Sequence, residues 1–305
     1  MGQLLAQRYN RPALLFLLVC QVCAFGAPAE TPETVYRANV SEVRITFSAT
    51  DQYNHAVATL NPGDLAVVDK DVIVRNFQSF TLAQFTRLEI TILIDPSESV
   101  GTQYREEIAQ VLELISKTSG VPDDSISIVS FSGVQPTLIC KGNCRASQAR
   151  DLIPSSASGG VTPLYDSMIF AADTFSWQDP QVRKVLVLFS DGEDTISRNS
   201  ASDAIEVPLA HDVEVYAVAM RPSTSRGTVF LQNLAAATGG RAFRLSDGAN
   251  SVADAILDDF HASYQLTYKL PYISAGFHTV RIVATHDSNL HFRCRRGYFY
   301  PSSQH

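Results

Sequence analysis

The chain has 305 residues, of which 45% are hydrophobic, and its formal net charge is −7. This length and composition allow about two domains with buried cores. An acidic chain without a basic cluster is a poor binder of nucleic acids and of anionic lipid head groups, so both classes of partner are disfavoured.

Residues 1–29 have the composition of an export signal. Two arginines precede the apolar stretch 12–20, and small residues follow over 24–29. The apolar stretch is shorter than the roughly 20 residues that a spanning helix needs, although an uncleaved anchor is the alternative. We therefore expect a cleaved signal peptide over 1–29 and a secreted or periplasmic mature chain without a membrane span.

The next segment, residues 30–86, reads as antiparallel strands. β-branched runs occur at 43–47 and 65–68, and they are separated by the turn sequence Asn-Pro-Gly-Asp at 61–64. Each run alternates in the way that half-buried strands do. A segment of this size is too small to form a stable sheet alone, so it needs a partner elsewhere in the chain.

Residues 87–262 alternate between predicted strands and helices. The strands are expected at 87–95, 125–131, 184–189, 213–220 and 241–245, with a hairpin around two cysteines near 140. The helices are expected at 104–118, 146–152, 164–175, 202–210, 229–238 and 252–262. Such alternation predicts an α/β domain with a doubly wound, Rossmann-like parallel sheet that is covered by helices on both faces.

Oxygen-bearing side chains follow two strands of this region. Asp95, Ser97 and Ser99 stand at alternate positions where the first strand ends, Asp191 follows the third strand, and Thr162 lies in a glycine loop just before a helix. Alternate side chains of extended backbone point to one side, and ligands of open α/β sheets gather at the carboxyl ends of strands. Small oxygen ligands suit Mg²⁺, whereas a turn or helix cap is the structural alternative.

This set of residues resembles the metal-ion-dependent adhesion site of the von Willebrand factor type A domain, which combines D-x-S-x-S, a loop threonine and a strand-end aspartate. The three elements occur here in the family's order and approximate spacing. The resemblance implies that Ser97, Ser99 and Thr162 bind Mg²⁺ or Mn²⁺ directly, while Asp95 and Asp191 act mainly through bound water. Neutral hydroxyls leave the cation under-neutralised, so we expect an exposed Asp or Glu of a protein partner to complete its coordination.

The carboxyl-terminal segment, residues 263–305, again reads as strands. Alternating runs occur at 264–268, 278–283 and 296–300. Because each flank is too small to be stable alone, we expect 30–86 and 263–305 to pair into one β-sandwich, with the α/β domain inserted between them.

The whole layout resembles the secreted von Willebrand factor A-related proteins that are common in acidobacteria, over nearly the full mature chain. Those proteins carry a strand segment of the form V-x-D-x-x-G-x-x-V-x-x-L-x-x-x-D-F and a terminal R-x-G-Y. The matching positions here are 50–57, 60 and 64–65 for the first, and 295–298 for the second. Asn54 replaces the turn glycine, and Leu65 stands where phenylalanine is common. Asparagine tolerates the left-handed backbone that glycine adopts, so we expect the turn to be kept.

Cysteine usage agrees with export. Cys140 and Cys144 lie close together in the sequence, and a local pair is expected to form a disulfide in an oxidising compartment. No histidine or further cysteine lies nearby to make a metal site with them. Cys294 is left over and is expected to lie in a strand as a small apolar residue, with its pairing state open.

An enzyme is the competing class of function. The seven histidines are scattered, and the sequence contains no H-E-x-x-H, G-x-S-x-G, P-loop or G-x-G-x-x-G motif. His286 and His291 could share a metal, but a polar hairpin is the favoured interpretation. Glu98, Glu193 and Asp194 could supply a general base, but their simpler role is to set the electrostatics around the cation. We predict a non-enzymatic, metal-dependent adhesion or assembly module; the alternatives are a structural envelope protein with a non-essential cation site and a metal-assisted hydrolase.

Overall fold

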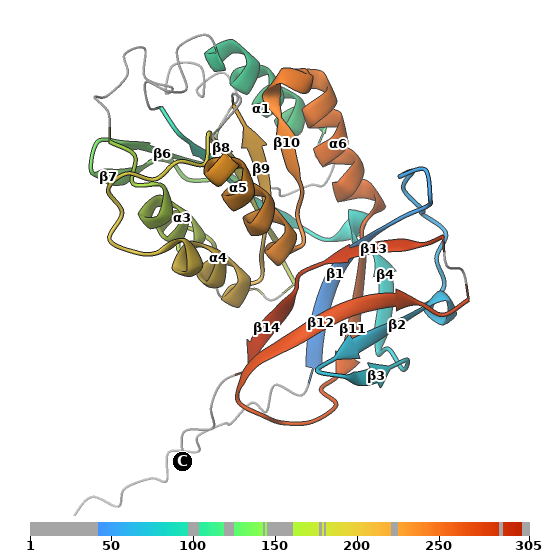
Figure 1. Cartoon of the computed structure of the whole chain (residues 1–305). Coiled ribbons are helices and arrows are strands. Elements are labelled where there is room, and N and C mark those ends of the chain that lie inside the picture. The colour runs from blue at the N-terminus through green and yellow to red at the C-terminus, as the bar shows by residue number, and fades with distance from the viewer. Residues whose placement is uncertain are drawn as a thin grey trace, which may run out of the picture. The chain divides into compact units, whose positions relative to one another are not determined.

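The computed structural model describes residues 42–96, 104–118, 125–142, 144, 161–176, 179, 181–220, 225–286 and 289–300. They all belong to one compact unit, Val40–His305 (Figure 1). The second unit, Met1–Asn39, lies outside the described residues, and so do the predicted signal peptide and the predicted helix 146–152. No helix in the described part is long and apolar enough to cross a membrane.

A six-stranded sheet forms the centre of the α/β domain, in the order β10-β9-β8-β5-β6-β7. Its strands are β5 (Leu88–Ile94), β6 (Ser125–Ser132), β7 (Gln135–Cys140), β8 (Arg183–Ser190), β9 (Val213–Ala219) and β10 (Ala242–Arg244). All neighbours run parallel except β7, which pairs antiparallel with β6 at one edge. All seven residues of β5 are buried, as expected for a central strand that is covered on both faces.

Helices cover both faces of this sheet, which confirms the doubly wound fold. They are α1 (Arg105–Thr118), α3 (Leu164–Ala172), α4 (Ala201–Ala210), α5 (Ser225–Thr238) and α6 (Ala249–Ala262). On β5, Ile90 and Ile92 pack towards α1 and α6, while Leu93 packs towards α3, α4 and α5. The two-residue period of the strand thus divides its apolar side chains between two cores.

The two flanks pair into a β-sandwich, as predicted. One sheet has the order β13-β1-β11-β4 and the other has the order β14-β12-β2-β3. The strands are β1 (Glu42–Thr50), β2 (Leu65–Asp69), β3 (Val72–Val74), β4 (Ser79–Leu82), β11 (Tyr264–Lys269), β12 (Gly276–Ala284), β13 (His291–Cys294) and β14 (Gly297–Tyr300). Each sheet contains strands from both flanks, so neither flank can complete a sheet without the other.

Two predicted turns can be compared with the structure. Asn54 adopts a left-handed backbone with φ of 62°, and the Asp51 side chain accepts hydrogen bonds from the backbone N–H groups of Tyr53 and His55, so the expected turn is present. The predicted hairpin over 286–291 is wrong, because β12 and β13 belong to different sheets. The connection therefore crosses from one layer of the sandwich to the other.

The cysteines follow the prediction in their pairing and differ from it in their position. Cys140 and Cys144 form a disulfide, and Cys144 packs into the core beside α1. The turn of the β6–β7 hairpin lies at Gly133, so the disulfide closes the far end of the hairpin and not its tip. Cys294 is a free thiol on β13, and burial raises its pKa to about 11.

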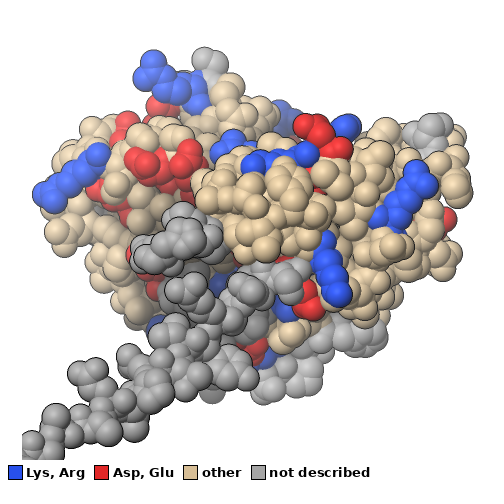
Figure 2. Space-filling model, turned by 90° about the horizontal axis from the view of Figure 1, so that it is seen from below, with Lys and Arg blue, Asp and Glu red and all other residues tan. Residues whose placement is uncertain are grey.

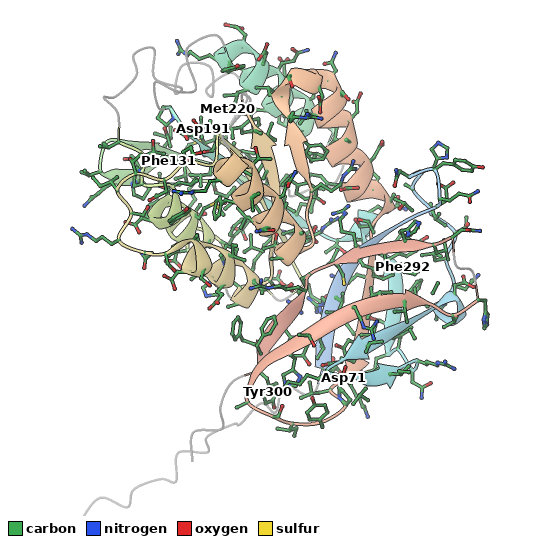
Figure 3. All side chains as sticks on the ribbon, in the orientation of Figure 1. Asp71, Phe131, Asp191, Met220, Phe292 and Tyr300 are labelled. Carbon is green, nitrogen blue, oxygen red and sulfur yellow. A yellow bond between two sulfur atoms is a disulfide. The ribbon has the colours of Figure 1, made fainter. Side chains whose placement is uncertain are left out.

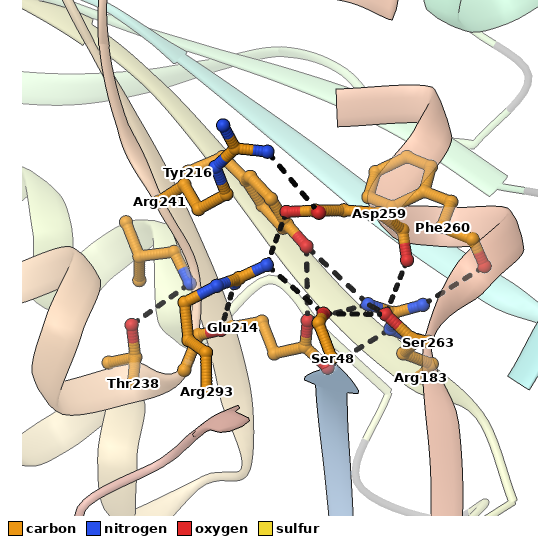
Figure 4. A network of polar contacts seen from close by, with 12 residues as sticks. Ser48, Arg183, Glu214, Tyr216, Thr238, Arg241, Asp259, Phe260, Ser263 and Arg293 are labelled. Carbon is orange, nitrogen blue, oxygen red and sulfur yellow. Dashed lines mark hydrogen bonds and ion pairs between the residues drawn. The ribbon is translucent and has the colours of Figure 1, made fainter. Parts of the chain in front are cut away.

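A network of buried polar side chains joins the α/β domain to the sandwich (Figure 4). Arg183, the first residue of β8, makes a two-pronged ion pair with Glu214, at 3.0 and 2.7 Å, and donates to the Ser263 hydroxyl at 3.2 Å. From the sandwich, Arg293 donates to the Asp259 carboxylate at 2.6 Å and to the Ser48 hydroxyl at 3.0 Å. We call Ser48, Arg183, Glu214, Asp259, Ser263 and Arg293 the junction network.

We expect Arg293→Ala to lower the free energy of unfolding by about 3 kcal/mol, because it leaves the Asp259 carboxylate, whose side chain is 11% exposed, without its shortest ion-pair contact. Arg244→Ala is the control, since that side chain is 77% exposed and lies 3.9 Å from Asp247, and its loss should cost less than about 1 kcal/mol. Urea unfolding of both variants measures the difference. Equal stability of the two variants would show that the network contributes nothing beyond an exposed ion pair.

Candidate metal centre

Asp95 is held where β5 ends, against the end of the neighbouring strand β8. Its backbone N–H donates to the Phe189 carbonyl at 2.9 Å, which extends the parallel pairing by one residue. Its carboxylate accepts a hydrogen bond from the Ser190 hydroxyl at 2.8 Å, and this hydroxyl in turn accepts from the Gly192 N–H at 3.0 Å. The Asp95 side chain is fully buried. Ser190, which sequence reasoning missed, therefore joins the two strand ends.

Asp191 and Thr162 are both fixed to the loop that follows β8. The Asp191 carboxylate accepts a hydrogen bond from the backbone N–H of Glu193 at 3.1 Å. Asp191 lies at the same end of the sheet as Met220 (Figure 3). The backbone N–H of Thr162 donates to the Thr195 hydroxyl at 2.7 Å, and the N–H of Thr195 donates to the Thr162 carbonyl at 2.9 Å. Neither of these bonds engages the Thr162 hydroxyl. The structure thus connects Asp95, Thr162 and Asp191 through one loop, whereas Ser97 and Ser99 lie outside the described residues.

The first turn of α5 lies directly on this loop because two glycines allow their backbones to meet. A Cβ atom on Gly227 would clash with the Asp191 carbonyl oxygen, and a Cβ atom on Gly192 would clash with the Gly227 carbonyl. Gly192 also has a φ of +81°, a backbone conformation that residues other than glycine rarely adopt. The position of α5 therefore restrains the peptide of Asp191, a contact that no sequence motif had indicated.

Acidic side chains organise the rest of the loop. The Asp194 carboxylate accepts from the Tyr165 N–H at 3.2 Å and from the Ser197 hydroxyl at 2.5 Å. The Asp166 carboxylate accepts from the N–H groups of Arg198 and Asn199. Burial opposes ionisation of Asp166, but these hydrogen bonds outweigh it and hold its pKa below the ordinary value. Burial, followed by the charges of Asp194 and of nearby Glu193, raises the pKa of Tyr165.

The donor set fits a hard divalent cation. Two buried carboxylates stand at strand exits, and a buried threonine stands just before helix α3. Oxygen ligands of this kind suit Mg²⁺ or Mn²⁺. Within the described ranges no three His, Cys, Asp or Glu side chains form a cluster that could hold a metal by themselves. A cation here would therefore need hydroxyl and water ligands, with Asp95 and Asp191 acting mainly through the bound water, as the resemblance implies.

A second group of titratable side chains lies inside the sandwich, and sequence reasoning did not find it. His278 Nδ1 lies 3.3 Å from the Asp69 carboxylate, and its Nε2 lies 3.1 Å from the Ser274 hydroxyl and 2.8 Å from the Ser274 carbonyl. A carbonyl only accepts, so Nε2 carries the hydrogen and cannot take a proton from the hydroxyl. Because Asp69 also accepts from the hydroxyls of Tyr268 and Tyr298, this group is a satisfied buried network and not a nucleophile with its base.

The fold and the strand-end aspartates define a class of protein, an open α/β domain whose loops at the carboxyl edge of the sheet offer oxygen ligands. The family model of the von Willebrand factor type A domain matches residues 89–257, which is more than half of the chain. The chain therefore belongs to this family. Domains of this family mediate protein–protein interactions and are typically not enzymes. A search of curated proteins gives no match.

Solved structures that are similar to this chain include proteins from bacteria and from a mussel. An aerotolerance-related membrane protein from Bacteroides fragilis is 18% identical with a TM-score of 0.45, over 57% of this chain and 98% of that one. BatB from Bacteroides thetaiotaomicron is 14% identical with a TM-score of 0.43, over 56% and 96%. Proximal thread matrix protein 1 from the mussel byssus, in a structure with a zinc-occupied MIDAS motif, is 13% identical with a TM-score of 0.48, over 63% and 50%. The family assignment rests on the family model and not on these likenesses.

We expect Gly227→Ala to lower the free energy of unfolding by about 1–3 kcal/mol, because the added methyl group overlaps the Asp191 carbonyl. An unobstructed Gly→Ala change inside a helix would instead stabilise by about 1 kcal/mol, so the sign of the effect is diagnostic. The control is Gly63→Ala, where no atom lies within 4 Å of the added group. Thermal unfolding of both variants tests the contact, and a stabilising effect of Gly227→Ala would contradict it.

Proposed function

We propose that the chain is an exported protein-binding module, which holds Mg²⁺ or Mn²⁺ through Asp95, Ser97, Ser99, Thr162 and Asp191 and uses the cation to capture a carboxylate of a partner protein. The observation that supports this most is the Ser190 hydroxyl, which joins the Asp95 carboxylate to the loop that carries Asp191. The family supports a protein-binding role in general.

Each residue has a proposed task at this site. The hydroxyls of Ser97, Ser99 and Thr162 bind the cation, and the carboxylates of Asp95 and Asp191 orient its bound water. When bound, the cation supplies positive charge at an open coordination position. Thr195 holds the backbone of Thr162 and so keeps its hydroxyl within the loop. A partner carboxylate is the ligand that this arrangement favours, because the hydroxyls bring no charge of their own.

The proposed partner is a protein and not a nucleic acid. The chain is acidic overall, with 31 Asp and Glu against 24 Lys and Arg. On the face seen in Figure 2, basic side chains are scattered singly among the described residues, and a group of acidic side chains gathers on one side. A phosphate backbone needs a continuous basic surface for affinity.

The proposed location is outside the cytoplasm, in the periplasm or secreted. The signal-like composition of residues 1–29 supports it, and so does the Cys140–Cys144 disulfide, because disulfides persist in oxidising compartments. Two other functions predict different behaviour. A structural envelope protein would bind its neighbours whether or not the metal is present, and a hydrolase would turn over an ester or peptide.

The proposal predicts that the protein binds about one Mg²⁺ or Mn²⁺ per chain, through three hydroxyl ligands and through water that the two aspartates orient. Asp95→Asn keeps the shape of the side chain and loses its charge, so it should weaken binding about 10- to 100-fold with the fold retained. The control is Asp71→Asn, in the β2–β3 turn, where φ is 70° and asparagine fits equally well. Calorimetric titration with unchanged affinity of Asp95→Asn would remove Asp95 from the site.

The proposal also predicts that a carboxylate of the partner binds through the cation. A partner that is captured by the immobilised protein in Mg²⁺ should be released by a chelator. The immobilised Thr162→Ala variant should fail to capture it. Replacing one partner Asp or Glu by its amide should remove most of the affinity, since an amide oxygen brings no compensating charge. Affinity that survives the chelator unchanged would move the binding surface elsewhere, and the sandwich would be examined next.

A further inference from the structure

Arg226 stands beside the proposed metal loop and has a fixed backbone position. Its neighbour Gly227 touches the Asp191 carbonyl and the Gly192 backbone, and consecutive Cα atoms lie about 3.8 Å apart, so Arg226 begins within one residue of the loop. The contact holds this first turn of α5 against the loop. The Arg226 side chain, by contrast, is exposed to solvent.

The first turn of α5, to which Arg226 belongs, also lies against the acidic part of the loop, because a carboxylate oxygen of Glu193 is 3.0 Å from the position that a Cβ atom on Gly227 would take. The positive charge of Arg226 lowers the pKa of Tyr165, whereas burial and the negative charges of Asp194 and Glu193 raise it. Among the residues that the structure describes, no acidic side chain lies within ion-pair distance of Arg226. Its charge is therefore available to a molecule that approaches the loop from solvent.

The charges on this rim matter for an acidic partner. Glu193 and Asp194 are only half-buried and repel a carboxylate that approaches the loop, whereas Arg226 attracts one. In an extended peptide, residues i and i+2 point to the same side and lie about 7 Å apart, so an acid-x-acid sequence presents two carboxylates side by side. One of them would bind the proposed cation, and the other would then lie within reach of a long side chain on the first turn of α5.

We propose that Arg226 is a specificity residue that selects partners with two neighbouring carboxylates, one for the cation and one for its own guanidinium. This inference rests on the proposed function, because it assigns the first carboxylate to the cation. The position of Arg226 depends on the Gly192–Gly227 contact, so the helix α5 and the metal loop act together in recognition. The second contact is an exposed ion pair, and its effect is a preference among partners, not the basis of binding.

The test uses two synthetic peptides, Gly-Ser-Asp-Ser-Asp-Ser-Gly and Gly-Ser-Asp-Ser-Asn-Ser-Gly, which differ only in one carboxylate that is replaced by its amide. Both are coupled at equal density to a sensor surface. A third peptide with the acid and the amide exchanged controls for which acid binds the cation. The full chain flows over the surface in Mg²⁺ at low ionic strength, where exposed ion pairs are least screened. The wild-type chain should bind the two-acid peptide about fivefold more tightly than either one-acid peptide.

Arg226→Ala should reduce this preference to less than about twofold, with the one-acid peptides and Mg²⁺ bound as in the wild type. Arg226→Glu should reverse the preference, because its negative charge would repel the second carboxylate of the two-acid peptide. Arg281→Ala removes an exposed arginine of the sandwich and should leave the preference unchanged.

Three results would overturn the inference. A wild-type chain that binds all three peptides equally in Mg²⁺ excludes a second carboxylate contact, while the proposed function stands. A preference that persists in Arg226→Ala assigns the contact to another residue. Peptide binding that is insensitive to both chelator and Asp95→Asn refutes the proposed function, and this inference with it.

Discussion

The antiparallel pairing of β1 with β11 is the contact on which the rest of the structure depends. It aligns Glu42 with Lys269 and Phe47 with Tyr264, and so joins the two flanks on either side of the inserted α/β domain. Ile45, Leu266 and Tyr268 on these strands are fully buried in the sandwich core. A hairpin from one flank would be marginally stable by itself, but the combined sheets bury a common core. The same pairing holds the ends of the α/β domain, where β5 begins and α6 ends, close to the sandwich.

The boundary between the two parts is polar, although it is buried. Arg183 opens β8 and belongs to the junction network, whereas Asp191 follows the last residue of the same strand. A strand of this length spans roughly 25 Å, so the proposed metal loop lies at the opposite end of the sheet from the sandwich. A partner at the loop would not compete with the sandwich for space. Charged partners at the junction also require each other, because a buried charge that loses its partner is costly.

The buried aspartates of this molecule lie in two different kinds of surroundings. Asp69 accepts hydrogen bonds from two tyrosines and faces a histidine, all inside the sandwich, so its carboxylate stabilises the fold. Asp95 and Asp191 are equally buried, but they stand where strands end and a loop begins. A carboxylate at a strand exit can meet a ligand from solvent, which one enclosed by aromatic side chains cannot. Location, and not residue type or burial, separates the role of Asp69 from the role proposed for Asp95 and Asp191.

The sequence by itself determined the strands and helices that the structure describes in the α/β domain, because period and apolar content are local properties of the chain. The small size of each flank also predicted that the two flanks pair. The sequence also singled out Asp95 and Asp191 after strands and Thr162 before a helix, because these residue types occur in the order of a known motif. It could not find Ser190 as the link between two strand ends, since any serine before an aspartate reads as a turn. Gly227, Arg226, Asp69 and His278 were likewise invisible. Each acts on residues far away in the sequence, and only the packing of α5 on the metal loop, and of one sandwich sheet on the other, brought them into contact.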